Sequence, residues 1–263
     1  MCRIETRDSF SRRRAGKMRP HTSYLICATN RSGSFLLCEA LKNTGLAGQP
    51  EEYFWRDDEP FWKERWGVSS YVDYVAGAFT QGTSPNGVFG AKIMWGYFDD
   101  VVGKLHSIPG YEGLPTAELL STIFPNVHYI WITRRDKVRQ AVSFEKAIQT
   151  NIWAMTEEPS PSTGELHFDV ARIEALILVI ESHEAAWQRY FAANRITPFM
   201  VIYEELVTAY EQTAMQILHE LSIPVPQPFQ FGPRRLRQQA DALSEEWVQR
   251  YHAYKRTSPD LTS

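Results

Sequence analysis

The chain has 263 residues, of which 43% are hydrophobic and 22% are charged, and its formal net charge is -3. These values are typical of a globular protein and exclude a chain that is disordered throughout. The slightly acidic balance argues against a nucleic-acid-binding protein, because such proteins usually carry a marked excess of Lys and Arg.

Strand and helix signals alternate along the chain. Apolar runs rich in β-formers predict strands at 23–29, 87–94, 127–133 and 198–203. Helical spacing predicts helices near 35–41, 60–66, 69–80, 99–106, 116–124, 136–150, 168–194 and 206–221, with loops at 159–164 and 224–233. The remaining segment, 234–254, is polar with scattered aromatic residues. This order predicts an α/β fold with a mostly parallel central sheet flanked by helices.

The two ends of the chain differ from the region between them. Residues 1–20 are polar and basic and lack the apolar stretch of a secretory signal, so we expect a disordered lead in which Met18 is an alternative start. A single domain over 21–256 and a short tail over 257–263 follow. No apolar run approaches the roughly 20 residues that span a membrane. The three cysteines form no CxxC pair, which indicates a reducing, cytoplasmic location and no zinc site.

Ligands of parallel α/β sheets bind beyond the carboxyl ends of the strands. The first such end carries the loop Asn30–Arg31–Ser32–Gly33–Ser34, directly before a predicted helix. Free N–H groups at a helix N-terminus bind phosphate or sulfate, Gly33 permits close approach, and Arg31 adds a cation. The alternative is an ordinary helix cap. The loop of ATP-binding proteins does not match, because its first Gly and its Lys are absent.

A second anion site is predicted after the third strand. Ser143 lies eight residues past Arg135, and about two turns of the predicted helix bring it back toward the end of the strand where Arg135 stands. An Arg and a Ser placed in this way can share one phosphate. The alternative is an exposed Arg135 that pairs with Asp136 or Glu145.

Together these features resemble the sulfotransferases that use 3′-phosphoadenosine 5′-phosphosulfate, and above all the Stf0 family. The resemblance runs from about residue 23 to residue 251 and rests on YLICATNRSGSFLL, TGLAGQPEEYF, PNGVFGAKIMW, AVSFEKAIQT and RQQADALSEEWVQRY. It implies a P-loop-like sulfotransferase fold, this nucleotide as sulfuryl donor, no metal, a carbohydrate-containing acceptor and a homodimer.

The resemblance also implies roles for individual residues. Arg31 would lie beside the bridging oxygen of the donor, and Glu52 would be the general base. The 5′-phosphosulfate would be held by Ser32, Gly33, Ser34 and Phe35, and the 3′-phosphate by Arg135 and Ser143. Asn30, Gln49, Glu51, Tyr53 and Trp55 would line the acceptor site. Phe35 departs from the pattern, because the founding member has a Thr there, and the segment after Trp55 is shorter, which leaves the acceptor open.

Sulfuryl transfer, like phosphoryl transfer, requires neutralisation of the leaving group and removal of the acceptor proton. Lys92 is a candidate for the first task beside Arg31, and Trp95 offers a further aromatic face to a sugar. The adjacent Glu51 and Glu52 point in different directions, so one of them is expected to reach the acceptor, and spacing alone does not choose between them. Two other functions fit the same loop: a small-molecule kinase and a nucleotide-binding module without turnover.

Overall fold

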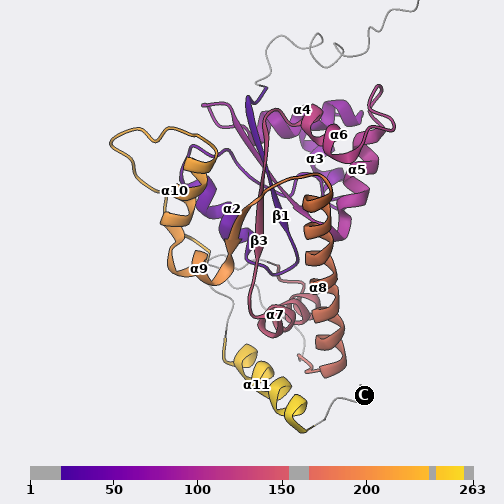
Figure 1. Cartoon of the computed structure of the whole chain (residues 1–263), viewed down its shortest axis with the longest axis vertical. Coiled ribbons are helices and arrows are strands. Elements are labelled where there is room, and N and C mark those ends of the chain that lie inside the picture. Colours follow the sequence, from indigo (N-terminus) through magenta and orange to yellow (C-terminus); the bar gives the residue numbers. More distant parts are fainter. Residues whose placement is uncertain (1–18, 154–165, 237–240, 258–263) are drawn as a thin grey trace, which may run out of the picture.

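The computed structural model describes residues 19–153, 166–236 and 241–257 (Figure 1). Most of the predicted lead, the loop at 159–164 and nearly all of the predicted tail lie outside these residues. No helix within the described ranges is long and apolar enough to cross a membrane.

A parallel sheet of four strands forms the centre, in the order β2-β1-β3-β4. Its strands are β1 (Thr22–Ala28), β2 (Val88–Met94), β3 (Val127–Thr133) and β4 (Phe199–Ile202). Ala28 pairs with Met94, and Cys27 pairs with Trp131, so the carboxyl ends of β1, β2 and β3 lie nearly level. The four predicted strands and the parallel sheet are confirmed.

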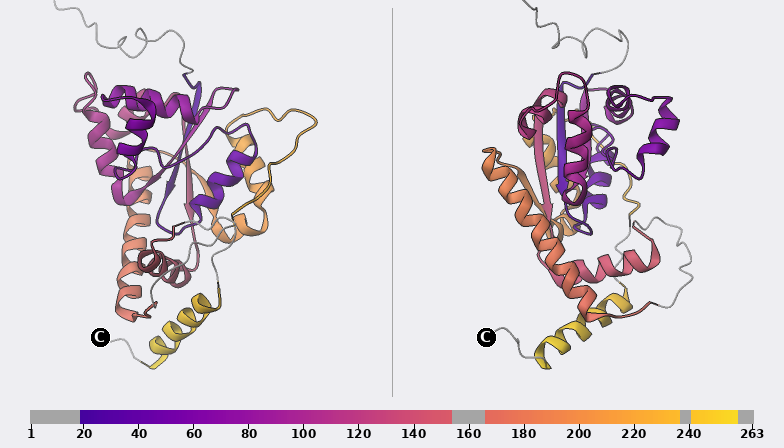
Figure 2. Two further views of the ribbon diagram at one scale, coloured as in Figure 1. Left: turned by 180° about the vertical axis from the view of Figure 1, so that it is seen from behind. Right: turned by 90° about the vertical axis from the view of Figure 1, so that its right-hand side faces the viewer.

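Helices cover both faces of the sheet (Figures 1 and 2). One layer holds α2 (Ser34–Asn43), α9 (Tyr203–Thr208) and α10 (Tyr210–Glu220). The opposite layer holds α3 (Glu59–Trp66), α4 (Tyr71–Gly82), α5 (Phe98–His106), α6 (Thr116–Ile123) and α8 (Val170–Ala193). A short 3-10 helix, η1 (Trp95–Tyr97), follows β2. Beyond the carboxyl ends of the strands lie α7 (Lys137–Thr150) and α11 (Ala242–Thr257).

The central strand β1 divides its side chains between two cores. Tyr24 and Ile26 pack in the cluster formed with α2 and α10, whereas Leu25 and Cys27 pack in the cluster formed with α4, α5, α6 and α8. Successive strand residues point to opposite faces, and every residue of β1 is buried, as is usual in a parallel sheet covered on both sides. Burial also raises the pKa of the Cys27 thiol well above its ordinary value.

Two elements differ from the predicted ones. The helix expected over 206–221 is two helices, because Ala209 has non-helical backbone angles between α9 and α10. The polar segment after residue 234 contains the helix α11, which the residue pattern did not predict. This helix is stabilised by tertiary contacts, because Trp247, Val248 and Tyr251 are buried in a cluster with residues of α7 and α8.

A hydrogen bond joins the longest helix to the end of the central strand. The indole N–H of Trp187, on α8, donates to the carbonyl of Ala28 over 3.0 Å, and both residues are buried. The bond holds the last peptide unit of β1 against the helix layer.

We predict that Trp187→Phe lowers the free energy of unfolding, because the Ala28 carbonyl is left buried and unpaired, at a cost of about 1–3 kcal/mol beyond the lost ring area. Urea unfolding measures the change. Trp66→Phe is the matched control, because the buried indole N–H of Trp66 has no hydrogen-bond partner among the described residues. Equal losses in the two variants would show that the Trp187 hydrogen bond contributes nothing.

Candidate active site

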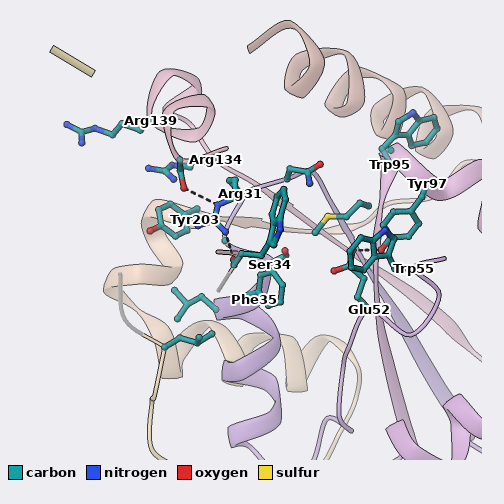
Figure 3. A pocket seen from close by; sticks show the side chains of 18 of the residues that line it. Arg31, Ser34, Phe35, Glu52, Trp55, Trp95, Tyr97, Arg134, Arg139 and Tyr203 are labelled. Atoms are coloured by element: carbon teal, nitrogen blue, oxygen red, sulfur yellow. Dashed lines mark hydrogen bonds between the residues drawn. The ribbon is translucent and has the colours of Figure 1, made fainter. Parts of the chain in front are cut away.

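A cavity of about 550 Å³ opens beyond the carboxyl ends of the strands (Figure 3). Residues that follow each of the four strands line it: Asn30, Arg31 and Gly33 after β1, Trp95, Gly96 and Tyr97 after β2, Arg134 after β3, and Tyr203 after β4. The predicted position of the ligand site is therefore the position of the cavity.

The loop after β1 makes a left-handed turn into α2. Arg31 has φ 62 and Gly33 has φ 94, both in the left-handed region. A side chain at position 33 would place its Cβ 2.3 Å from Cδ2 of Tyr203, so only Gly fits. No side chain caps the N-terminus of α2. The N–H groups of its first turn are therefore available to an anion.

Arg31 connects the two predicted anion sites. Its Nε donates to the hydroxyl of Ser143 over 3.0 Å, and its NH1 donates to the carbonyl of Trp153. Burial, with a contribution from the nearby Arg134, lowers the pKa of Arg31 to about 10. The guanidinium therefore keeps its positive charge at neutral pH.

Two further arginines make this end of the cavity basic (Figure 3). The guanidinium of Arg134 lies 4.6 Å from the ring centre of Tyr203, and burial lowers its pKa. Arg139 also lines the cavity and forms ion pairs with Asp136 and Glu245. Sequence reasoning missed Arg134, Arg139 and Tyr203, although Arg134 and Tyr203 stand at the strand ends where ligand residues were expected.

Arg135 does not belong to the cavity. Its side chain is 60% exposed and pairs with Glu205 of α9. Consecutive residues at the end of a strand point to opposite sides, so Arg134 and Arg135 diverge. The structure thus brings Ser143 together with Arg31 and Arg134, and separates it from the arginine eight residues earlier.

A carboxylate stands at the other end of the cavity. Glu52 accepts a hydrogen bond from the hydroxyl of Tyr97 over 2.6 Å and pairs with Nζ of Lys92 over 2.7 Å. Lys92 is only 1% exposed, and its ammonium lies 3.4 Å from the ring centre of Phe35. Tyr97 was not predicted from the sequence.

The neighbouring carboxylate points elsewhere. Glu51 pairs with Lys42, its side chain is 41% exposed, and its carbonyl accepts the N–H of Lys92 over 2.9 Å. This backbone bond ties the segment to β2 and turns the next side chain, that of Glu52, into the cavity. Of the two carboxylates, only Glu52 lines it.

The other predicted residues divide into two groups. Those that line the cavity are Asn30, Ser34, Phe35, Trp55 and Trp95, in addition to Arg31, Gly33, Glu52 and Ser143. Gln49 is exposed outside it, and Tyr53 is a core residue stacked on Phe89, so neither reaches the cavity. Ser32 is buried in the loop, where its hydroxyl has no partner among the described residues. Within the same ranges, no cluster of three or more His, Cys, Asp or Glu could hold a metal.

Comparison of the sequence with known protein families identifies a match over most of the chain. The sequence model of the Stf0 sulphotransferase family matches residues 23–254. The trehalose 2-sulfotransferases of Mycolicibacterium smegmatis and Mycobacterium tuberculosis are 31% and 29% identical to this chain, over 88% of it and 94% of each relative. Among solved structures, the sulfotransferase domain of the Synechococcus PCC 7002 olefin synthase aligns with a TM-score of 0.43 and 14% identity, covering 95% of this chain and 92% of that one.

The left-handed turn of the loop generates a prediction. Gly33→Ala should lower the free energy of unfolding by more than the about 1–2 kcal/mol that a left-handed backbone costs an L-residue, because Tyr203 must also move. Gly45→Ala is the control, because Gly45 has φ +65 and no atom near its Cβ position. Chemical unfolding of both variants gives the comparison, and a Gly33 variant that loses no more than the Gly45 variant contradicts the prediction.

Proposed function

Because the chain belongs to the Stf0 sulfotransferase family, we propose that it transfers a sulfuryl group from 3′-phosphoadenosine 5′-phosphosulfate to a hydroxyl of a carbohydrate-containing acceptor. The observation that carries this proposal is the two-ended cavity, in which buried arginines stand at one end and a carboxylate with aromatic side chains at the other. The resemblance to the family also supports the proposals that the enzyme works without a metal, in the cytoplasm and as a homodimer.

The basic end fits a nucleotide that carries several anionic groups. Desolvation and the nearby Arg134 lower the pKa of Arg31, and desolvation lowers the pKa of Arg134, so a bound phosphate or sulfate would stabilise the charges of both guanidinium groups. Two buried donors at this end have no hydrogen-bond partner among the described residues: the hydroxyl of Ser32 and Nε of Arg134, which lies 4.0 Å from a carboxylate oxygen of Glu204. The loop N–H groups and Arg31 would hold the 5′-phosphosulfate and stabilise the charge that develops on the leaving group.

The carboxylate end fits the removal of a proton. We assign Glu52 as the general base that accepts the acceptor's hydroxyl proton as the oxygen attacks sulfur. The hydroxyl of Tyr97 donates a hydrogen bond to Oε1 of Glu52, and Nζ of Lys92 forms an ion pair with Oε2. The hydrogen bond from Tyr97 and the ion pair with Lys92 orient the base.

The acceptor is proposed to be a sugar, free or attached to a lipid or natural product. The names of the two mycobacterial relatives state that they act on trehalose, and they match most of this chain. Trp55, which lies beside Glu52 in Figure 3, and Trp95 both line the cavity, and their rings offer apolar faces to a sugar. An acceptor screen with labelled donor, read by mass spectrometry, tests this proposal directly.

A thermal-shift panel separates the three candidate functions. A ligand that binds the folded state raises stability by RT ln(1 + [L]/Kd). Adenosine 3′,5′-bisphosphate should raise the unfolding temperature, and ATP with Mg²⁺ should raise it less. A preference for ATP would favour a kinase. Donor binding without transfer to any sugar in the screen would favour a non-catalytic module.

Glu52→Gln should lower turnover about 10²–10⁴-fold, because the amide cannot take a proton at neutral pH. Glu51→Gln is the matched control, since its carboxylate points out of the cavity, and it should change turnover little. Glu52→Gln also leaves the buried ammonium of Lys92 without its counter-ion, so the free energy of unfolding of this variant is measured as well. Near-native turnover of a folded Glu52→Gln protein would remove Glu52 from this role.

A binding experiment can decide whether Arg134 or Arg135 binds the 3′-phosphate of the donor. Arg134→Ala should weaken binding of adenosine 3′,5′-bisphosphate by roughly tenfold to a hundredfold, the effect of losing one charge-assisted hydrogen bond. Adenosine 5′-phosphosulfate, which lacks this phosphate, should be affected less. Arg135→Ala is the control in calorimetry, because its side chain pairs with Glu205 outside the cavity. A larger loss in the Arg135 variant would return the role to Arg135, as the resemblance implies.

A further inference from the structure

A buried amide side chain lies behind the loop after β1. Gln140, on α7, is 0% exposed, and its Nε2 donates to the carbonyl of Asn30 over 2.8 Å and to the hydroxyl of Thr29 over 3.0 Å. Both acceptors belong to the turn that leads into Arg31. Gln140 does not line the cavity, so it can affect a ligand only through this turn.

The bond to Asn30 sets the direction of the next N–H group. A peptide unit is planar and trans, so its C=O and N–H point in opposite directions. A carbonyl of Asn30 held toward α7 therefore turns the N–H of Arg31 away from Gln140. Within the described residues this N–H donates no hydrogen bond, although Arg31 lines the cavity. A free backbone donor beside buried arginines is suited to binding an anion.

The carbonyl oxygen of the Gln140 side chain does not stabilise the fold. Oε1 of Gln140 is buried and has no hydrogen-bond partner among the described residues. Burial of an unpaired carbonyl costs free energy, which an apolar side chain of similar size would avoid. The contribution of Gln140 therefore lies in its Nε2 donor and in the turn that this donor holds.

We propose that Gln140 is a positioning residue that keeps the N–H of Arg31 directed at the 5′-phosphosulfate of the donor. The proposal rests on the proposed function, since it assumes the nucleotide that the family uses. It adds one backbone donor to the loop and assigns its orientation to a side chain on another element.

The test is the binding of two nucleotides, measured by calorimetry. Gln140→Leu and Gln140→Glu should each weaken adenosine 3′,5′-bisphosphate by roughly tenfold to a hundredfold at neutral pH, as expected for one lost charge-assisted hydrogen bond. Adenosine 3′-monophosphate, which has no 5′-phosphate, should bind all three proteins equally. Equal weakening of both nucleotides would mean that the substitutions only disturb the fold.

The pH dependence of Gln140→Glu gives a readout that a structural role would not produce. An ionised Glu has no proton to donate to Asn30, whereas a protonated Glu donates its O–H as the amide does. Burial raises the pKa of such a carboxyl, and the positive charges of Arg31 and Arg134 oppose that rise. Relative to the native protein at each pH, the affinity of the Glu variant should recover as the pH falls through this pKa. The Leu variant should show no recovery.

Gln149→Glu is the matched control on the same helix. The Nε2 of Gln149 also donates to a backbone carbonyl, that of His167, over 2.8 Å, and to Glu145, but among the described residues it donates no hydrogen bond to the loop after β1. This variant should bind adenosine 3′,5′-bisphosphate like the native protein. If the native protein does not bind this nucleotide, the proposed function is wrong. If it binds and Gln140→Glu binds equally well at every pH, only the role of Gln140 is wrong.

Discussion

The carboxyl end of β1 is held by three donors from three parts of the chain. The indole N–H of Trp187 donates to the carbonyl of Ala28, and the N–H of Ser32 donates to the carbonyl of Thr29. The side-chain amide of Gln140 donates to the carbonyl of Asn30. These hydrogen bonds hold the backbone between the end of β1 and the beginning of α2, where Arg31 adopts a left-handed conformation. This turn positions the N-terminus of α2 and the guanidinium of Arg31 at the cavity.

Charge in the cavity is arranged at a cost to the folded protein. Arg31 and Arg134 are buried near one another, and desolvation and mutual repulsion both lower the pKa of Arg31. Such an arrangement is destabilising without an anion and favourable with one. At the other end, the buried ammonium of Lys92 forms an ion pair with Glu52, and loss of either partner would leave the other charge without a counter-ion.

The two ends suit an in-line transfer. The donor's leaving group needs positive charge and N–H donors, which stand after β1 and β3. In the proposed reaction the acceptor would need a base and a surface for its ring, and Glu52, Trp55 and the cavity residues after β2 would provide them. A parallel sheet brings these groups to one edge because all its strands end on the same side. The cavity is thus a consequence of the topology, and its chemistry a consequence of a few residues at the strand ends.

The sequence by itself determined the positions of the four strands and of the loop after β1, and the parallel arrangement of the sheet. Their β-branched and aromatic runs, with helical spacing between them, specify a parallel α/β sheet through local patterns that depend on near neighbours in the chain. It also indicated Arg31, Gly33 and Ser143, because loop chemistry and helical spacing are local too. The family resemblance already favoured Glu52, although spacing did not choose between Glu51 and Glu52. Only the tertiary structure showed that Glu52 faces the cavity and Glu51 does not, that Arg134 rather than Arg135 faces it, and that Tyr53 is a core residue. Those choices depend on which side of a strand end meets the cavity, and contacts between distant segments, such as Glu51 with β2 and Arg135 with α9, set that side.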